Sequence, residues 1–323
     1  MNVTLQGLMT KRTRGPTGEP TSWTQRTSNF STAYMQSGAY GSDGNYVIIG
    51  GYEESSPVPR AITQTDPTGA WSLNTSTGRT AFFEMGLIHD GTYWITGSAI
   101  DGICYVSDPT GAWSTLSNNV NMSGLFNDGT SMYVCGEGVN NTKYWTATSA
   151  TGTWTLRTNP FSGDRIYAVG YDGTNWVVAG VNGKMEYSPT PANDATWTTI
   201  STPFSTSTVY GVFYANGYWV AVAAGGKIAT ATSASGSWTL HGDTPFTADT
   251  IRSVYYGASA WAICGNAGKI ATCGADPTGS WTLRTSSFGG SDSLSTIFYG
   301  DGKWVCGGGN GEEGLVATAV PGT

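Results

Sequence analysis

The stretch Asp108-Pro109-Thr110-Gly111-Ala112-Trp113 has close copies at Asp66-Pro67-Thr68-Gly69-Ala70-Trp71 and at Asp276-Pro277-Thr278-Gly279-Ser280-Trp281. Asp, Pro, any residue and Gly form the residue set of a type I turn, because Pro presets φ and Asp bonds back to the turn amides. The Trp that follows is large enough to fill a gap between packed elements. We therefore interpret each copy as a capped turn followed by a buried plug.

Weaker versions of this turn precede four further tryptophans in the chain. The seven anchoring residues are Trp23, Trp71, Trp113, Trp154, Trp197, Trp238 and Trp281. Their spacings are 48, 42, 41, 43, 41 and 43 residues. A period of this length is typical of repeat architectures such as propellers.

Each unit also has a second turn about halfway between successive tryptophans. Most units place Asp-Gly or Asn-Gly there, at Asp43-Gly44, Asp90-Gly91, Asp128-Gly129, Asp172-Gly173, Asn216-Gly217 and Asp301-Gly302. Such a pair between apolar runs is a strong hairpin signal, because both residues tolerate positive φ. Four short strands per unit result. The sequence therefore predicts an all-β fold, a seven-bladed β-propeller of four-stranded antiparallel blades.

The two ends of the chain complete each other in this scheme. Trp23 begins a fourth strand with no hairpin before it, and the chain finishes near 315–319 with a third strand and no Trp after it. We expect the N-terminal outer strand to join the C-terminal blade and close the ring. Residues 23–323 are then one propeller domain, and 1–22 an arm or extra strand. Residues 7–11 also resemble a third strand, so the surplus segment is either a fifth outer strand or an arm that reaches a neighbouring copy.

Composition excludes several classes of function. Charged residues are only 11% of the 323 residues and the net charge is -7. Binding to a nucleic-acid backbone needs Lys and Arg gathered on one face, so nucleic acid is not an expected partner. Residues 1–15 lack the apolar core of a signal peptide, and no apolar run is long enough to span a bilayer. We expect no membrane insertion and folding in a cytoplasm.

The five cysteines are odd in number and contain no CxxC pair. Cys135, Cys264 and Cys306 occupy the same place in their units, just before a Gly, which favours a small buried core position. An intermolecular disulfide formed by Cys104 or Cys273 is the alternative.

The turn and its Trp resemble the Asp-box, or bacterial neuraminidase repeat, of sialidase-like propellers. Ser107, Asp108, Gly111 and Trp113 match its residue types, although Gly follows Asp by three positions rather than the usual two. The units rich in Thr, Ser and Gly that end in Gly-x-Trp-Thr also look like propeller proteins of tailed-bacteriophage particles. The resemblance implies a propeller and a place in a virion, and carries little information on chemistry.

The expected strand order assigns the connections to two rims. The Asp-Gly and Asp-Pro-Thr-Gly turns share one rim, and the more variable connections share the other. Ligand contacts concentrate on variable loops held by a rigid scaffold. The candidate binding residues on this second rim are Arg79, Asp164, Arg165, Asp249, Arg252 and Asp292.

Catalytic interpretations of these residues are weaker. A sialidase needs three converging arginines, and the resemblance would use Arg79, Arg165 and Arg252, with Asp164, Asp249 or Glu84 nearby. Their offsets from the following hairpin turn differ, so nothing in the sequence makes them converge. The chain is therefore expected not to be an enzyme.

Metal and cofactor sites are not expected either. His89 and His241 show no metal-ligand spacing, and His89 takes a turn-edge place where another unit has Asn127. The turn aspartates lie about 42 residues apart, so they indicate turn capping rather than a calcium site. The recurring tryptophans indicate packing between blades, with sugar stacking as the alternative.

These observations lead to a functional hypothesis. We expect a non-enzymatic virion structural or adhesion protein, such as a capsid, neck or tail decoration or a receptor-binding propeller, which contacts other virion proteins and a cell-surface glycan. A sialidase-type hydrolase and a soluble propeller lectin are the alternatives. A homo-oligomer through the N-terminal arm is also open.

Overall fold

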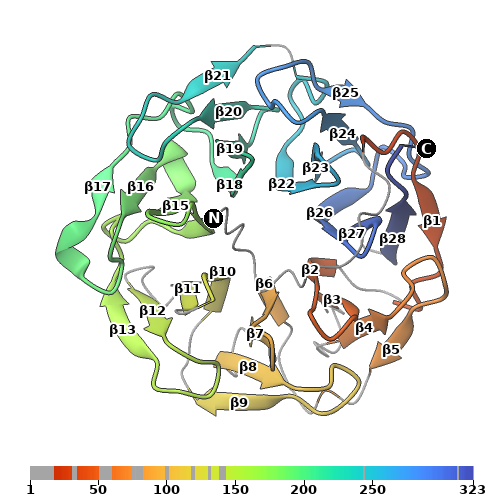
Figure 1. Ribbon diagram of the computed structural model, residues 1–323, viewed down its shortest axis with the longest axis horizontal. Coiled ribbons are helices and arrows are strands. Elements are labelled where there is room, and N and C mark those ends of the chain that lie inside the picture. The colour runs from red at the N-terminus through yellow and green to blue at the C-terminus, as the bar shows by residue number, and fades with distance from the viewer. Residues whose placement is uncertain are drawn as a thin grey trace.

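The computed structural model describes residues 18–30, 35–50, 60–74, 77, 83–98, 102–117, 121–129, 132–137, 143–242, 244–310 and 313–322. Within these ranges the strands form seven four-stranded antiparallel sheets arranged around a centre (Figure 1). In each sheet one strand lies nearest the centre and another at the perimeter. The predicted β-propeller with four-stranded antiparallel blades is confirmed.

The first three blades, from the centre outward, cover the N-terminal part of the ring. Blade 1 contains β2 (Met35–Tyr40), β3 (Tyr46–Gly50), β4 (Arg60–Gln64) and β5 (Ser72–Asn74). Blade 2 contains β6 (Phe83–His89), β7 (Trp94–Ser98), β8 (Gly102–Val106) and β9 (Ser114–Ser117). Blade 3 contains β10 (Asn121–Asn127), β11 (Met132–Glu137), β12 (Lys143–Ala147) and β13 (Thr155–Thr158).

The next three blades follow the same order. Blade 4 contains β14 (Ile166–Tyr171), β15 (Trp176–Gly180), β16 (Met185–Ser188) and β17 (Thr198–Thr199), with the short 3-10 helices η1 (Val181–Gly183) and η2 (Asp194–Thr196). Blade 5 contains β18 (Val209–Ala215), β19 (Tyr218–Ala223), β20 (Ile228–Ala231) and β21 (Thr239–His241). Blade 6 contains β22 (Ile251–Gly257), β23 (Ala260–Gly265), β24 (Ile270–Cys273) and β25 (Thr282–Leu283).

Both ends of the chain contribute to blade 7. It contains β26 (Ser293–Gly300), β27 (Lys303–Gly309), β28 (Gly314–Ala319) and, at its outer edge, β1 (Thr24–Arg26). β1 pairs antiparallel with β28, and Thr24 lies opposite Thr318. The predicted closure of the ring by the N-terminal strand is confirmed, and it covers an edge that would otherwise be open.

The segment before β1 packs on blade 6. The Gly18 amide donates to Ala258 O (2.8 Å), and the Glu19 carboxylate pairs with Arg284 and accepts from Thr272 Oγ1 (2.6 Å). The part of the expected arm that is described, residues 18–22, therefore lies on the ring. Residues 1–17, including the alternative strand at 7–11, lie outside the described residues.

The predicted capped turns and plugs are largely confirmed. Oδ1 of Asp108 accepts from the amide (2.9 Å) and hydroxyl (2.7 Å) of Thr110, and these bonds lower the pKa of the carboxyl. Asp66 and Asp276 make the same two bonds with the Thr two positions on. The buried anchors, each at most 7% exposed, are Trp23, Trp71, Trp113, Trp154, Trp238 and Trp281.

Trp197 is the exception, because its ring is only half-buried. Its unit replaces the Asp-Pro-x-Gly turn by η2, and the buried Tyr144 fills the neighbouring space. The two rings meet edge to face at 6.0 Å, and Trp197 Nε1 donates to the Tyr144 hydroxyl (3.0 Å). The interpretation of Trp197 as a fully buried plug is therefore wrong.

The cysteines of the described residues lie in the core. Cys104, Cys264, Cys273 and Cys306 are buried free thiols. The repeat position predicted this burial for Cys264 and Cys306, and the structure buries Cys104 and Cys273 as well. Burial raises the pKa of Cys273 to about 11. The side chain of Cys135 lies outside the described part of the chain.

Candidate functional site

The connections between strands form two rims of different construction. We call the rim with the first-to-second and third-to-fourth connections the turn rim, and the rim with the remaining connections the loop rim. On the turn rim, Asn216 Nδ2 donates to Ala275 O (3.0 Å), and Lys303 Nζ lies 3.7 Å from Asp66 Oδ1. Hairpin turns and Asp-containing turns of neighbouring blades thus meet on one rim, as predicted.

The loop rim is more regular than its sequence suggested. The loops that enter blades 1, 4, 5 and 6 each bury a phenylalanine to 1% exposure or less, at Phe30, Phe161, Phe204 and Phe246. Phe288 holds the same place before blade 7 and is half-buried. These four loops therefore each carry a buried anchor beside their variable residues.

A hydroxyl near four of these residues, Phe30, Phe204, Phe246 and Phe288, ties the loop to the preceding blade. Thr202 Oγ1 donates to Gly183 O (2.7 Å), and Ser286 Oγ donates to Gly268 O (3.0 Å). Ser28 bonds to Gly314 O and Thr244 to Gly226 O in the same way. We call this contact the loop clasp. It links neighbouring blades by a bond whose acceptor is a backbone carbonyl.

A lysine after the clasp glycine completes the connection in three blades. Nζ of Lys184, Lys227 and Lys269 donates to the carbonyl of Phe161, Phe204 and Phe246, at 3.0, 3.2 and 3.4 Å. This clasp was not predicted from the sequence. Its signal was present, since Phe161, Phe204, Phe246 and Phe288 recur at 43, 42 and 42 residues.

Two of the predicted acidic residues neutralise these lysines. Asp164 Oδ2 lies 2.7 Å from Lys184 Nζ, and Asp249 Oδ2 lies 2.7 Å from Lys269 Nζ. The bond from Lys184 lowers the pKa of the Asp164 carboxyl. Both acids therefore act mainly within the rim.

Asp292, another predicted residue, bonds within its own loop. Asp292 is only 7% exposed, and its Oδ2 accepts from the Gly289 amide (2.6 Å), so this carboxylate holds its own loop. Its role as a binding residue stays a prediction. Arg79 lies outside the described residues, as does the side chain of Glu84.

Each innermost strand carries an irregularity near its loop-rim end. The pairing with the second strand shifts register there in every blade, which adds one residue, or two in β6. Such bulges re-aim a side chain and are frequent beside functional sites. The extra residues are Gln36, Ser123, Tyr167, Tyr210, Arg252 and Ser295, with residues 84–86 at this place in β6.

Three of these bulge residues join Arg165 in a continuous cluster across blades 4, 5 and 6. The Arg165 guanidinium lies over the Tyr167 ring at 4.9 Å, and Tyr167 meets Tyr210 at 5.0 Å. The Arg252 guanidinium lies over the Tyr210 ring at 5.5 Å. We call Arg165, Tyr167, Tyr210 and Arg252 the Arg–Tyr arc. It lies at the inner edge of the loop rim, because its members stand at the start of the innermost strands.

Hydrogen bonds position both ends of the Arg–Tyr arc. Arg165 Nη1 donates to the Tyr167 hydroxyl (3.4 Å). Arg252 Nε donates to Asn266 Oδ1 (2.8 Å), and the same oxygen accepts from Ser293 Oγ (3.1 Å). Two predicted arginines are thus brought to one surface, but two phenol rings separate them. They do not converge on one point as a sialidase would require.

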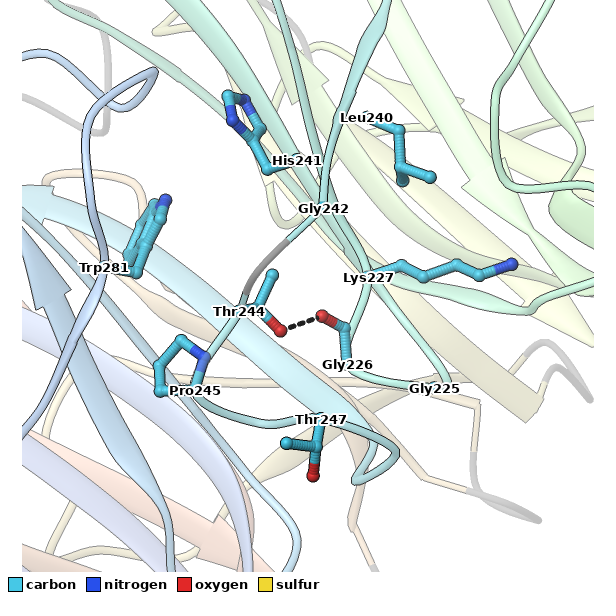
Figure 2. A pocket seen from close by; sticks show the side chains of 10 residues that line it. All are labelled: Gly225, Gly226, Lys227, Leu240, His241, Gly242, Thr244, Pro245, Thr247 and Trp281. Carbon is cyan, nitrogen blue, oxygen red and sulfur yellow. Dashed lines mark hydrogen bonds between the residues drawn. The ribbon is translucent and has the colours of Figure 1, made fainter.

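A cavity of about 540 Å³ lies between blades 5 and 6 on the outer part of the loop rim (Figure 2). Its lining consists of Gly225, Gly226, Lys227, Leu240, His241, Gly242, Thr244, Pro245, Thr247 and Trp281. Figure 2 shows Trp281 on one side, Leu240 on the other and the clasp bond of Thr244 between them.

The loop beside this cavity is longer than its equivalents in the other blades. Phe246 follows Trp238 by eight residues, whereas Phe204 follows Trp197 by seven, as in the other blades with this anchor. His241 bonds to Thr230 Oγ1 through Nε2 (3.0 Å), and burial lowers the pKa of its imidazole. The lining brings no set of charged groups together, so the Arg–Tyr arc is the stronger candidate site.

Neither a metal cluster nor a membrane-spanning helix occurs in the described part of the chain. Within it, no three or more His, Cys, Asp and Glu side chains gather as a metal site would require. Over the same residues, no helix has the length and apolar character to cross a bilayer.

Comparison with known proteins places the fold. No family model matches the chain, and no curated protein matches its sequence. A structure of YCF48 bound to D1 peptide is 13% identical with a TM-score of 0.68, covering 95% of this chain and 99% of that one. YCF48 from Cyanidioschyzon merolae is also 13% identical, with a TM-score of 0.65 and coverage of 93% and 98%.

An enzyme shares the same shape. A catalytically inactive virginiamycin B lyase from Staphylococcus aureus with quinupristin is 12% identical, with a TM-score of 0.75 and coverage of 92% and 99%. Identities this low show the fold alone, and one fold hosts many functions. The comparisons thus confirm that the chain is similar to β-propellers; its sialidase-like type and phage origin stay predictions.

Proposed function

We propose that this chain is a non-enzymatic structural or adhesion protein of a phage-like particle, which presents its loop rim to a partner protein or a cell-surface glycan. The observation that carries the proposal is the Arg–Tyr arc. Three of its members, Tyr167, Tyr210 and Arg252, place side chains of different chemistry on equivalent bulges of a backbone tied by the loop clasp. Such an arrangement suits recognition, because the scaffold is ordered before the ligand arrives.

Composition and resemblance support the particle assignment. Low charge with abundant Gly, Ser and Thr suits a packed assembly, and the Gly-x-Trp-Thr units look like those of phage propellers. A recognition role is also compatible with the fold, because the YCF48 structure is described as bound to D1 peptide.

The first test is quantitative mass spectrometry of purified particles from a host that expresses the chain. We expect the protein at a constant ratio to the major capsid protein after gradient purification. Loss of the protein during purification, with the capsid ratio falling at each step, would refute the particle assignment.

The second test addresses recognition and catalysis together. The purified protein, the double variant Arg165→Gln/Arg252→Gln and the control Arg157→Gln are compared on a glycan array and against the separated proteins of the particle. Arg157 is a suitable control, because it lies on the outer strand β13 and bonds to Thr146 Oγ1 (3.2 Å). We expect binding that only the double variant loses. Turnover of a fluorogenic sialoside by the wild type would instead indicate a hydrolase.

A further inference from the structure

The loop rim of blades 4 to 6 differs in charge from the rest of the molecule. Its loops, its second-to-third turns and its bulge residues hold five cations against three acids, although the whole chain has a net charge of -7. The cations are Arg165, Lys184, Lys227, Arg252 and Lys269, and the acids are Asp164, Asp243 and Asp249. The protein as a whole is acidic, but the loop rim of blades 4 to 6 therefore favours an anionic partner.

The lysines of the three blades are not equally neutralised. Lys184 and Lys269 have their aspartates at 2.7 Å. In blade 5 the equivalent loop position is Ser207, whose amide bonds to Phe204 O as the Asp249 amide bonds to Phe246 O. Among the described residues Lys227 has no carboxylate partner, and its Nζ donates to Phe204 O (3.2 Å).

Arg252 keeps hydrogen-bonding capacity within the Arg–Tyr arc. It uses Nε for Asn266, and its two terminal nitrogens have no hydrogen-bond acceptor among the described residues. A guanidinium donates through a planar fork that matches a carboxylate. The bond to Asn266 holds the group in place, so little side-chain entropy is lost when a carboxylate binds.

The phenols of the Arg–Tyr arc are poorly placed to stack on a sugar. A guanidinium covers one face of each ring, and the two rings lie against each other at 5.0 Å with an interplanar angle of 50°. Stacking needs an open ring face. The surface therefore offers cations and hydroxyl groups rather than an apolar platform, which fits carboxylates on a flexible backbone better than a pyranose ring.

We propose that the Arg–Tyr arc binds an extended acidic peptide segment of a partner protein, with two carboxylates on Arg165 and Arg252 and the intervening residues over Tyr167 and Tyr210. The inference rests on the proposed recognition function and names its ligand. The contacts along the arc measure 4.9, 5.0 and 5.5 Å. At about 3.3 Å per extended residue, the two acidic side chains lie roughly three to five residues apart.

Fluorescence polarisation with labelled peptides tests this directly. The probes are Ser/Gly peptides that carry two Glu four positions apart, two Gln at the same positions, or a single Glu. We expect the two-Glu peptide to bind about tenfold more tightly than the Gln peptide, since charge-assisted hydrogen bonds contribute at this level. Arg252→Gln should weaken binding about tenfold and abolish the preference for two Glu, whereas Arg157→Gln should leave affinity unchanged.

Further readouts separate the inference from the proposed function. Circular dichroism and thermal unfolding of each variant establish that it is folded. Equal binding of Glu and Gln peptides, or equal affinity of Arg252→Gln and wild type, would overturn the acidic-peptide ligand. Tighter, Arg252-dependent binding of an oligogalacturonate than of the peptide would also overturn it, and would leave a glycan-binding particle protein intact. Absence from purified particles would refute the particle role alone.

Discussion

The turn rim and the loop rim tie neighbouring blades together by different means. On the turn rim, Trp94 Nε1 donates to Asp43 Oδ2 of the previous blade (2.8 Å), and Trp219 Nε1 donates to Asp172 Oδ2 (3.2 Å). The Asp of the hairpin turn is thus part of the connection. On the loop rim the connection is the loop clasp, which uses a hydroxyl, a lysine and backbone carbonyls. The bulge residue takes no part in it.

This difference shows where the fold can vary without losing its ring. Asp or Asn recurs in the hairpin turns, because its side chain bonds the turn and the next blade. The bulge position instead holds Gln36, Tyr167, Tyr210, Arg252 and Ser295 on one backbone geometry. A repeated backbone with a changing side chain is what a recognition surface needs.

We expect the largest effect from truncating a buried aromatic ring on either rim. Comparing the two truncations tests whether the loop rim is anchored as firmly as the turn rim. Trp113 is 1% exposed and Phe204 is 0% exposed. Truncating either ring leaves a large cavity, so we expect Trp113→Ala and Phe204→Ala each to lower the unfolding free energy by about 3–5 kcal/mol. Denaturant unfolding measures this, with Leu240→Ala as the control, because that side chain is 39% exposed. A loss below about 1 kcal/mol for Phe204→Ala, far under the cost of emptying a core site, would show that the loop rim has no anchor of its own.

Glycines on the two rims should respond unequally to an added methyl group. Gly173 on the turn rim has φ +94, and a Cβ added there would meet nothing within 4 Å. Gly183 on the loop rim has φ +66, and an added Cβ would lie 2.1 Å from Ser205 O. Positive φ alone costs an Ala roughly 1–2 kcal/mol, and the clash with backbone adds roughly 1–3 kcal/mol. We expect Gly183→Ala to destabilise clearly more than Gly173→Ala. Equal midpoints in thermal unfolding would contradict the tight approach at the clasp.

Much of the fold was predictable, because its signals are local. The turn at Asp108 follows from Asp, Pro and Gly chemistry, and the period follows from the Trp that must fill each gap between blades. Closure by β1 followed from counting strands at both ends. Trp197 was misplaced because Tyr144, which meets it edge to face, lies far away in sequence.

The site was less predictable, because it depends on register. Arg165 and Arg252 were candidates from the sequence, but their offsets gave no sign that Tyr167 and Tyr210 join them. A bulge moves a side chain by one position without any change in residue type, so periodicity does not reveal it. The loop bond of Asp292 to the Gly289 amide was not predictable either, because a loop-capping carboxylate and a ligand-facing one have the same sequence appearance.

Removing a threonine hydroxyl group should also destabilise the two rims unequally, by smaller free energies than the substitutions above. Thr202 donates to Gly183 O from a partly buried site (2.7 Å), whereas Thr110 donates to Asp108 Oδ1 in an exposed turn (2.7 Å). Removing the buried donor leaves a carbonyl unsatisfied, so Thr202→Val should cost about 1 kcal/mol. Water replaces the lost donor in Thr110→Val, for which we expect no more than a few tenths of that value. Chemical denaturation of both variants measures the difference, and an equal cost would mean that the clasp bond is solvated.

The smallest expected effect is that of pH. It should change the stability contributed by the turn rim and leave peptide binding on the loop rim unchanged. His89 on the turn rim accepts from the amides of Ser42 (3.3 Å) and Gly91 (3.2 Å) through Nδ1, and burial lowers its pKa, while Asp43 and Asp90 oppose the shift. Because the unfolded chain binds this proton more readily, stability is fully present above the ordinary pKa near 6.5 and falls as pH drops through it.

His89→Asn tests that assignment, because Asn127 makes the equivalent bond from its own turn, accepting from the Gly129 amide (2.6 Å). Between about pH 7.5 and 5.5, which spans the ordinary histidine range, we expect the unfolding free energy of the wild type to fall and that of His89→Asn to fall less steeply. His241, whose pKa burial also lowers, supplies the remaining slope. Peptide binding at the Arg–Tyr arc should stay constant over this range, because arginines and peptide carboxylates keep their charge there. An affinity that changes in parallel with stability would mean that the two rims are coupled through the blades rather than independent.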